Sequence, residues 1–186
     1  MTIRPILTYP QQQAALRKPS DPVARMSAEV EALIQDMKDS LASQPGAGLS
    51  AVQIGVHQRI SLMCFGQDEG EIQPPLVVIN PKITQVGPPA KGFDGCLSIP
   101  KLVTWDTLRP SWLVFTGRDE HWKTIRLKVE GIDARVVSHE IDHLDGKLFL
   151  DLLTPTSKLY LPQTDANGEE KLVEVTSMIG QTRYLK

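Results

Sequence analysis

The stretch from Ser138 to Gly146 reads S-H-E-I-D-H-L-D-G and contains the pattern H-E-x-x-H. An α-helix makes one turn about every 3.6 residues, so His139 and His143 lie about one turn apart on the same face. The two imidazoles could therefore bind the same metal ion. Glu140 follows the first histidine and could hold a proton beside the ion without being a ligand itself. The alternative is an ordinary core helix whose two histidines satisfy each other's polar atoms. In both cases the stretch predicts an interior helix that ends near Gly146.

A catalytic metal site on such a helix needs a third protein ligand. One class continues the motif to H-E-x-x-H-x-x-G-x-x-H, but its final position here is Phe149, which cannot bind a metal. Another class, which includes zinc endopeptidases, takes a glutamate from a later segment. The downstream candidates lie in or just after a predicted turn at 165–168, and they are Glu169, Glu170 and Glu174.

A cysteine thiolate could also be the third ligand, and the chain has two cysteines. Cys64 lies in a predicted strand, where we expect a buried and inert thiol. Cys96 follows Gly95 at the start of a short apolar segment, and it is the best third ligand in the sequence. Two cysteines do not make a disulfide framework, so we expect a cytoplasmic protein whose thiols stay reduced.

Length and composition limit the class of protein. The 186 residues, of which 41% are hydrophobic, predict one globular domain, residues 1–186, with a sizeable core. A net charge of −2 argues against a general nucleic-acid-binding protein. The chain has no apolar run long enough to span a bilayer and no signal-peptide pattern at its start. We therefore expect no DNA or membrane partner, and a monomer.

Helical and β signals place the other elements. Apolar residues at helical spacing predict an N-terminal amphipathic helix from Ser27 to Ala42, with Ser27 as its N-cap. Prolines in residues 1–25 predict an extended arm with turns. Runs of β-forming residues predict short strands at 60–65, 76–79, 112–116 and 124–129.

The fold expected from these elements is α+β, a single domain with short antiparallel β-sheets packed around the central H-E-x-x-H helix. Residues 155–186 are expected to be a C-terminal extension. Apolar runs at 159–161 and 172–175 flank the turn at 165–168, which predicts a β-hairpin there.

Three motifs follow one another along the chain, G-A-G-L-S-A-V-Q at 46–53, D-G-C-L-S at 94–98 and H-E-I-D-H-L-D-G at 139–146. Together they resemble the motifs of the peptide deformylases. That family has a glycine-rich motif ending in glutamine, an E-G-C-L-S motif and an H-E-x-D-H motif. The resemblance runs from about residue 6 to about residue 153 and does not cover residues 155–186.

The resemblance implies a metal site and its chemistry. Cys96, His139 and His143 match the metal ligands of the family, and Glu140 matches its catalytic acid and base. Family enzymes typically hold Fe²⁺ in the cell and also work with Ni²⁺, Co²⁺ or, poorly, Zn²⁺. Thiolate and imidazole donors suit the same metals.

The resemblance also implies residues that contact substrate. The side-chain amide of Gln53 and the backbone N–H of Leu97 match the donors to the substrate carbonyl oxygen. Gly48 and Gly95 match positions that meet the substrate peptide.

The activity implied is hydrolysis of the N-formyl group of N-formylmethionyl nascent peptides, with release of formate. Association with ribosomes is left open. The alternatives are a related hydrolase that acts on a different N-formyl or N-acyl substrate, and a zinc endopeptidase with a downstream glutamate ligand.

The sequence departs from the family pattern at several positions. Asp94 stands where the family has a glutamate that pairs with a downstream arginine, for which Arg109 is the matching candidate. Ser50 and Val52 replace small and proline-like positions of the first motif. Residues 101–106 lack the usual G-x-R sequence. The resemblance places this segment at the pocket rim, so the resemblance alone does not fix the substrate preference.

Overall fold

The structure is a computed structural model, and it describes residues 2–66, 74–164 and 168–175. Most of the predicted turn at 165–168 lies outside the described residues. The helices and strands, in chain order, are α1 (Gln13–Leu16), α2 (Ala28–Ala42), β1 (Gly48–Ser50), η1 (Ala51–Ile54), β2 (Ile60–Met63), β3 (Leu76–Val86), β4 (Pro89–Cys96), β5 (Ile99–Pro110), β6 (Trp112–Arg118), β7 (Thr124–Glu130), α3 (Gly131–Leu144), η3 (Phe149–Leu152), β8 (Leu159–Thr164) and β9 (Glu170–Glu174).

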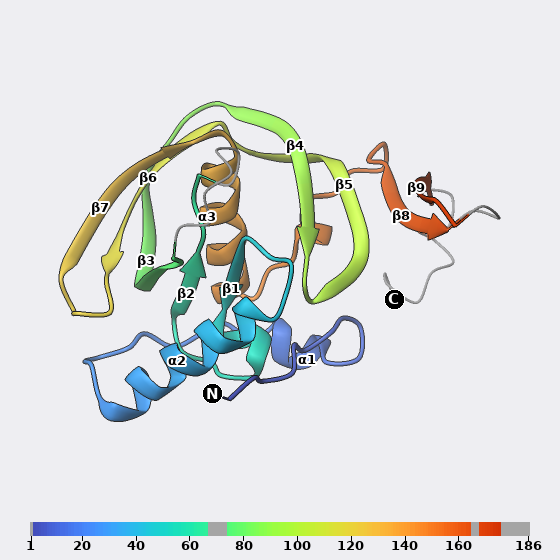
Figure 1. The fold of residues 1–186 in the computed structure, drawn as a ribbon. Coiled ribbons are helices and arrows are strands. Elements are labelled where there is room, and N and C mark those ends of the chain that lie inside the picture. Colours follow the sequence, from blue (N-terminus) through green and yellow to red (C-terminus); the bar gives the residue numbers. More distant parts are fainter. Residues whose placement is uncertain (1, 67–73, 165–167, 176–186) are drawn as a thin grey trace.

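The described strands form two antiparallel sheets with α3 between them (Figure 1). One sheet has the strand order β1-β2-β3-β6-β7 and the other the order β4-β5-β8-β9. Strands of both sheets contact α3, which confirms the predicted α+β fold around the H-E-x-x-H helix. β1 and β4 are each the edge strand of a sheet, so both have an unpaired side for a further chain.

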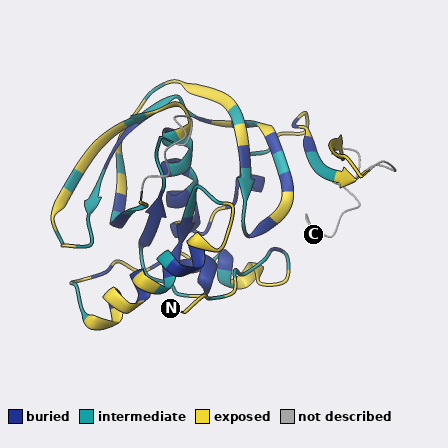
Figure 2. Cartoon of the chain, viewed as in Figure 1, coloured by how far each residue is buried: buried dark blue, intermediate teal, exposed yellow. Residues whose placement is uncertain are grey.

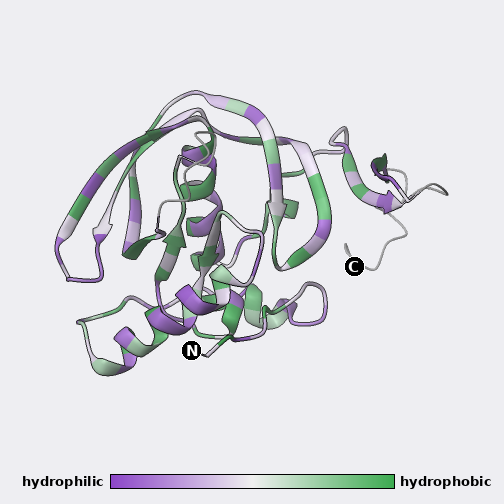
Figure 3. Ribbon diagram, in the orientation of Figure 1, coloured by the Kyte–Doolittle hydropathy of each residue, from purple (hydrophilic) through white to green (hydrophobic). Residues whose placement is uncertain are grey.

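The N-terminal amphipathic helix is confirmed to within one residue. Its N-cap Ser27 accepts a hydrogen bond from the backbone N–H of Val30, and the helix continues to Ala42. Hydrophobic and hydrophilic bands alternate along α2 in Figure 3, as expected for a helix with one face on the core. The apolar residues on its buried face are Val30, Leu33, Ile34, Met37 and Leu41.

The central helix α3 is held by apolar side chains on its inner face. Val137, Ile141 and Leu144 are buried, and α3 and β2 include many of the dark-blue residues in Figure 2. The helix ends at Leu144, and Gly146 follows with φ 73°, a conformation that favours glycine. A side chain at this position would also collide with the carbonyl of Arg17.

The C-terminal hairpin is confirmed, and it is attached to the second sheet. β8 pairs with β5 and with β9. Leu159 and Val175 are buried in a cluster with Ile99 and Leu102, so the hairpin contributes to the core.

Other predictions were wrong or incomplete. The N-terminal arm includes a short helix, α1, which buries Leu16. Strands β4 and β5 were not predicted as strands, and β3 continues to Val86 instead of ending at residue 79. Cys64 follows β2 instead of lying in it, and its side chain is half-buried rather than buried. Among the described residues, no helix is long and apolar enough to cross a membrane.

Candidate metal centre

The structure brings the three predicted ligands together from two elements. His139 and His143 lie one turn apart on α3, and Cys96 is the last residue of β4. Their ligand atoms all lie within 4.8 Å of one another, and Cys96 Sγ is 3.2 Å from His143 Nε2. Among the residues that the structure describes, this is the group of side chains suited to hold a metal ion.

This donor set fits a divalent metal ion. One sulfur and two imidazole nitrogens converge, which suits iron, zinc, cobalt or nickel and leaves a coordination position open. Glu170 and Glu174 lie on the exposed strand β9 and Phe149 lies in the core, so neither alternative for the third ligand is realised. The structure therefore favours the thiolate over a downstream glutamate, and this argues against the zinc endopeptidase alternative.

Asp94 orients the first histidine. Its Oδ1 lies 2.7 Å from His139 Nδ1, which leaves Nε2 of that ring for the ion. Burial disfavours the charged imidazole, but the hydrogen bond to Asp94 and the neighbouring Cys96 raise the pKa of His139 well above its ordinary value. A metal ion must compete with that proton, so metal affinity should fall at low pH.

The second histidine has a different environment. Burial and the charge of His139 lower the pKa of His143 well below its ordinary value, so its ring stays neutral, the form that binds a metal. Its Nδ1 is buried and has no hydrogen-bond partner in the described part of the chain.

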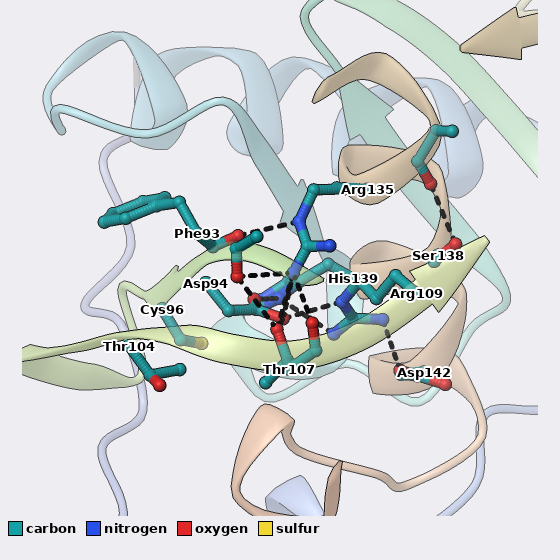
Figure 4. A network of polar contacts seen from close by, with 12 residues as sticks. Phe93, Asp94, Cys96, Thr104, Thr107, Arg109, Arg135, Ser138, His139 and Asp142 are labelled. Carbon is teal, nitrogen blue, oxygen red and sulfur yellow. Dashed lines mark hydrogen bonds and ion pairs between the residues drawn. The ribbon is translucent and has the colours of Figure 1, made fainter. Parts of the chain in front are cut away.

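A buried arginine completes this network (Figure 4). Arg109 Nε donates to Asp94 Oδ2 at 2.6 Å and Arg109 Nη1 donates to Asp142 Oδ2 at 2.8 Å. Arg109 is thus confirmed as the partner of Asp94, and the shorter acid reaches both the arginine and His139. Although burial works against the carboxylate, these partners hold the pKa of Asp94 well below its usual range.

A second arginine, Arg135 on α3, fastens β4 to the helix. Its Nε donates to the carbonyl of Phe93 at 2.9 Å, and its Nη2 donates to the carbonyl of Gly92 at 2.8 Å and to Thr107 Oγ1 at 2.5 Å. These bonds hold the strand that ends in Cys96 against the helix that provides both histidines (Figure 4). Sequence reasoning missed Arg135, because nothing in its neighbours along the chain marks its partners.

Glu140 lies buried beside the ligands, where serines and a glycine surround its carboxylate. Ser50 Oγ lies 2.7 Å from Glu140 Oε2 and 2.7 Å from Ser61 Oγ, and both serines are fully buried. A Cβ on Gly48 would collide with Glu140 Oε1, so glycine is needed for this approach. The two serines were not predicted as site residues, although Ser50 was noted as a departure from the family motif.

The amide of Gln53 is fixed above Cys96. Its Oε1 accepts from the backbone N–H of Ser50 at 2.8 Å, and its Nε2 donates to Ser98 Oγ at 3.2 Å. Nε2 also lies 3.7 Å from Cys96 Sγ. Two partners therefore set the orientation of the amide, and its Nε2 lies beside one of the three metal ligands.

Gln53, Cys96, His139 and Glu140 line a cleft with a volume of about 500 Å³. Gly48 of β1 and Gly95 of β4 both line it, so the edge strands of the two sheets border the same cleft. Leu97 and residues of segment 101–106 line it as well, which places that altered segment at the cleft as expected. The apolar part of its wall includes Pro45, Leu97, Pro100, Val103, Ile132 and Val136.

Comparison with known proteins identifies the family of this chain. A sequence model of the family described as Polypeptide deformylase matches residues 3–159. The chain is 41% identical over 154 residues to a peptide deformylase of Alkalilimnicola ehrlichii, with 83% of this chain and 84% of the relative covered. It is 40% identical over 175 residues to that of Caldicellulosiruptor bescii, with 94% and 100% covered.

Solved structures give the same result. The peptide deformylase of Ehrlichia chaffeensis in complex with actinonin matches with a TM-score of 0.76 and 34% identity, covering 83% of this chain and 90% of that chain. The enzyme of Thermotoga maritima matches with a TM-score of 0.75 and 29% identity, covering 83% and 100%. The metal-ligand cluster, the fold and both kinds of similarity lead to one conclusion: this chain belongs to the polypeptide deformylase family.

Proposed function

We propose that this cleft removes the formyl group from N-formylmethionyl peptides, the reaction of the family, at one divalent metal ion held by Cys96, His139 and His143. The observation that supports the proposal most directly is the position of the Glu140 side chain. Its buried carboxylate adjoins the ligand set and lines the same cleft as the ligands Cys96 and His139.

The ion would supply the positive charge that activates a water molecule and polarises the formyl oxygen. Burial raises the pKa of Glu140, while His139, the hydroxyl of Ser50 and Arg109 act in the opposite direction. A raised pKa lets one carboxyl group both accept and return a proton near neutral pH. In the proposed reaction Glu140 accepts the proton of the attacking water and passes it to the leaving nitrogen. The C–N bond then breaks, and the products are formate and a free amino terminus.

The formyl oxygen becomes negatively charged when water adds to the formyl carbon, and this oxyanion needs hydrogen-bond donors. We assign this role to Gln53 Nε2 and to the backbone N–H of Leu97. The fixed amide of Gln53 supports the assignment, because a donor that is already oriented needs no reorganisation during the reaction. Both residues line the cleft beside Cys96.

The shape of the cleft supports a peptide substrate. Its apolar wall suits the methionine side chain, and the unpaired sides of β1 and β4 offer backbone groups to an extended peptide near Gly48 and Gly95. The proposal has further parts. Fe²⁺ as the ion in the cell rests on the family resemblance. The single domain rests on the chain length, and the cytoplasmic location rests on the two unpaired cysteines. A monomer is the default expectation, and association with ribosomes stays open.

The direct test is release of formate from formyl-Met-Ala-Ser by protein loaded with Fe²⁺ or Ni²⁺. We expect turnover that is lost on chelation and restored when metal is added back. The same peptide with an acetyl group serves as the control, since a related N-acyl hydrolase would prefer it. A folded, metal-loaded protein that releases acetate but no formate would contradict the proposed substrate.

A further inference from the structure

Three aromatic side chains form a row across the second sheet, one each from β4, β5 and β8. The rings of Phe93 and Trp105 lie 5.3 Å apart between centroids, and those of Trp105 and Tyr160 lie 5.5 Å apart, both edge-to-face. Phe93 is 43% exposed and Trp105 is 44% exposed. Large aromatic rings next to one another on a surface are typical of binding sites rather than of scattered exposed residues.

This aromatic row (Phe93, Trp105 and Tyr160) continues the wall of the cleft. Alternate residues of a strand share a face, so Phe93 lies on the same face of β4 as Gly95. A Cβ on Gly95 would lie 3.3 Å from the Phe93 ring and 3.2 Å from Val103, and all three residues line the cleft. Phe93 therefore belongs both to the wall of the cleft and to the aromatic row.

The C-terminal hairpin builds the far end of the row. Tyr160 is paired in register with Val103, which lies two residues before Trp105 on β5. The junction is held by hydrogen bonds from Thr104 Oγ1 to the carbonyl of Lys158 at 2.7 Å and from the backbone N–H of Lys158 to Asp106 Oδ2 at 2.8 Å. Figure 1 shows β4, β5 and β8 following one another away from α3. Tyr160 is thus presented by a strand fixed to the sheet.

We propose that the aromatic row binds an apolar stretch of the substrate peptide, downstream of the formylmethionyl residue held in the cleft. The inference rests on the proposed function, because the formylated end must first occupy the site. A peptide whose first residue lies between β1 and β4 can leave the cleft over Phe93, which adjoins it. Aromatic rings that already pack against one another lose little conformational freedom on binding, so they favour apolar and aromatic side chains in the bound peptide. The row also gives the altered segment 101–106 a role, since Trp105 is part of it.

The test uses three formylated peptides that share one beginning: formyl-Met-Ala-Ser, formyl-Met-Ala-Ser-Gly-Phe-Leu and formyl-Met-Ala-Ser-Gly-Ser-Ser. Steady-state formate release gives kcat and KM for the wild type, Trp105→Ala and Trp105→Phe. The control is Leu108→Ala, because Leu108 is 50% exposed on the same strand but lies outside both the cleft and the row. Binding of the apolar hexapeptide to metal-loaded Glu140→Gln protein, with and without Trp105→Ala, gives a second readout that does not depend on turnover.

We expect the wild type to prefer the apolar hexapeptide through a lower KM. Trp105→Ala should raise the KM for the apolar hexapeptide, and its Kd measured by calorimetry, about fivefold or more, as expected when an aromatic anchor is removed. The KM for the tripeptide should stay within about twofold of the wild-type value. Trp105→Phe should keep most of the preference, and Leu108→Ala all of it. The inference would be overturned if Trp105→Ala raised the KM of the tripeptide and of the apolar hexapeptide equally. It would also be overturned if the wild type had the same KM for the apolar and the polar hexapeptide. A dimer that dissociates on Trp105→Ala would overturn it too, because the row would then be covered by a second copy. Failure of the wild type to deformylate even the tripeptide would instead count against the proposed function.

Discussion

Asp94 Oδ1 lies 2.7 Å from His139 Nδ1, while the other oxygen of the same carboxylate accepts a hydrogen bond from Arg109. Asp94 precedes Cys96 by two positions on β4, so one strand end provides both a metal ligand and the carboxylate that orients another ligand. The geometry of the site therefore depends on how β4 is held against α3, and the buried pair with Arg109 is part of that attachment.

Replacing Asp94 by asparagine should destabilise the fold. The change leaves the buried guanidinium of Arg109 without its closest carboxylate, and breaking a buried pair of this kind typically costs about 3–5 kcal/mol. Urea unfolding at pH 7 measures the effect. Glu130→Gln is the control, because Glu130 pairs with Lys128 on the surface and its loss should cost about 0.5 kcal/mol or less. Similar effects of both changes would contradict a structural role for the buried pair.

The contribution of Asp94 should also depend on pH. Burial opposes its ionisation, but the hydrogen bond from His139 and the charge of Arg109 hold its pKa well below the usual range. The stabilisation is therefore complete above the unfolded pKa of about 4 and is lost as the pH falls towards the lower folded pKa. We expect the difference in unfolding free energy between wild type and Asp94→Asn to be constant from about pH 5 to about pH 7 and to shrink below about pH 4. If the difference in unfolding free energy between wild type and Asp94→Asn grew as the pH fell, the pKa of Asp94 would have to be raised in the folded protein and not lowered.

Motif spacing predicted the cluster of Cys96, His139 and His143 better than it predicted the sheet that supports it. The ligand pair, the thiolate, α2 and the C-terminal hairpin could be read from local patterns. Strand β4 could not, because residues 87–96 read G-P-P-A-K-G-F-D-G-C and carry little β signal. Its partner β5 was missed although Val103, Trp105 and Thr107 are β-forming residues. Their pairing has irregular register near Asp94 and Cys96, and Arg135 bonds to carbonyls of this hairpin from α3. Such contacts between distant segments decide the local structure there and leave no periodic trace in the sequence.

The two cysteines should behave differently on replacement. Cys96→Ala removes the thiolate from the ligand set, so metal content should fall clearly below one ion per chain. Cys64→Ala is the control, because burial raises the pKa of this thiol and it lies outside the cluster. Elemental analysis of both purified variants measures the result. Full occupancy after Cys96→Ala would remove the proposed site from consideration, and metal loss after Cys64→Ala alone would point to the wrong thiol.

A methyl group at Gly48 should harm catalysis more than metal binding. The new Cβ would collide with Glu140 Oε1, so the carboxylate must turn away from its present position. We expect the Gly48→Ala protein to keep its metal. Its rate of formate release should fall at least about tenfold, because the carboxylate that carries the proton is no longer in position. Metal loss in parallel with activity would show that the collision is relieved by moving α3.

Ser50 should tune the protonation of Glu140. Its hydroxyl hydrogen bond opposes the rise in pKa that burial imposes on the carboxyl. Ser50→Ala should therefore raise that pKa, and the acid limb of the pH profile of kcat/KM should move to higher pH. Ser138→Ala is the matched control, because this buried serine on α3 donates to the carbonyl of Ala134 instead. An acid limb unchanged by Ser50→Ala would mean that the profile reports a group other than Glu140.

Glu140→Gln separates metal binding from chemistry. Glutamine keeps the size of the side chain and can still meet the hydroxyl of Ser50, but it cannot accept a proton. The histidines and Cys96 are untouched, so metal content and binding of a metal-chelating hydroxamate should be largely retained. Formate release should fall by roughly 10²–10⁴, the usual effect of a general acid and base, or more because the group acts twice. Asp142 is the nearest other carboxylate on α3, but its Oδ2 accepts from Arg109 at 2.8 Å, so it is a poor substitute. Near wild-type release by a folded, metal-loaded Glu140→Gln protein would refute this role. Asp142→Asn would then be the next variant to assay, and loss of activity there would move the proton carrier to the Arg109 network.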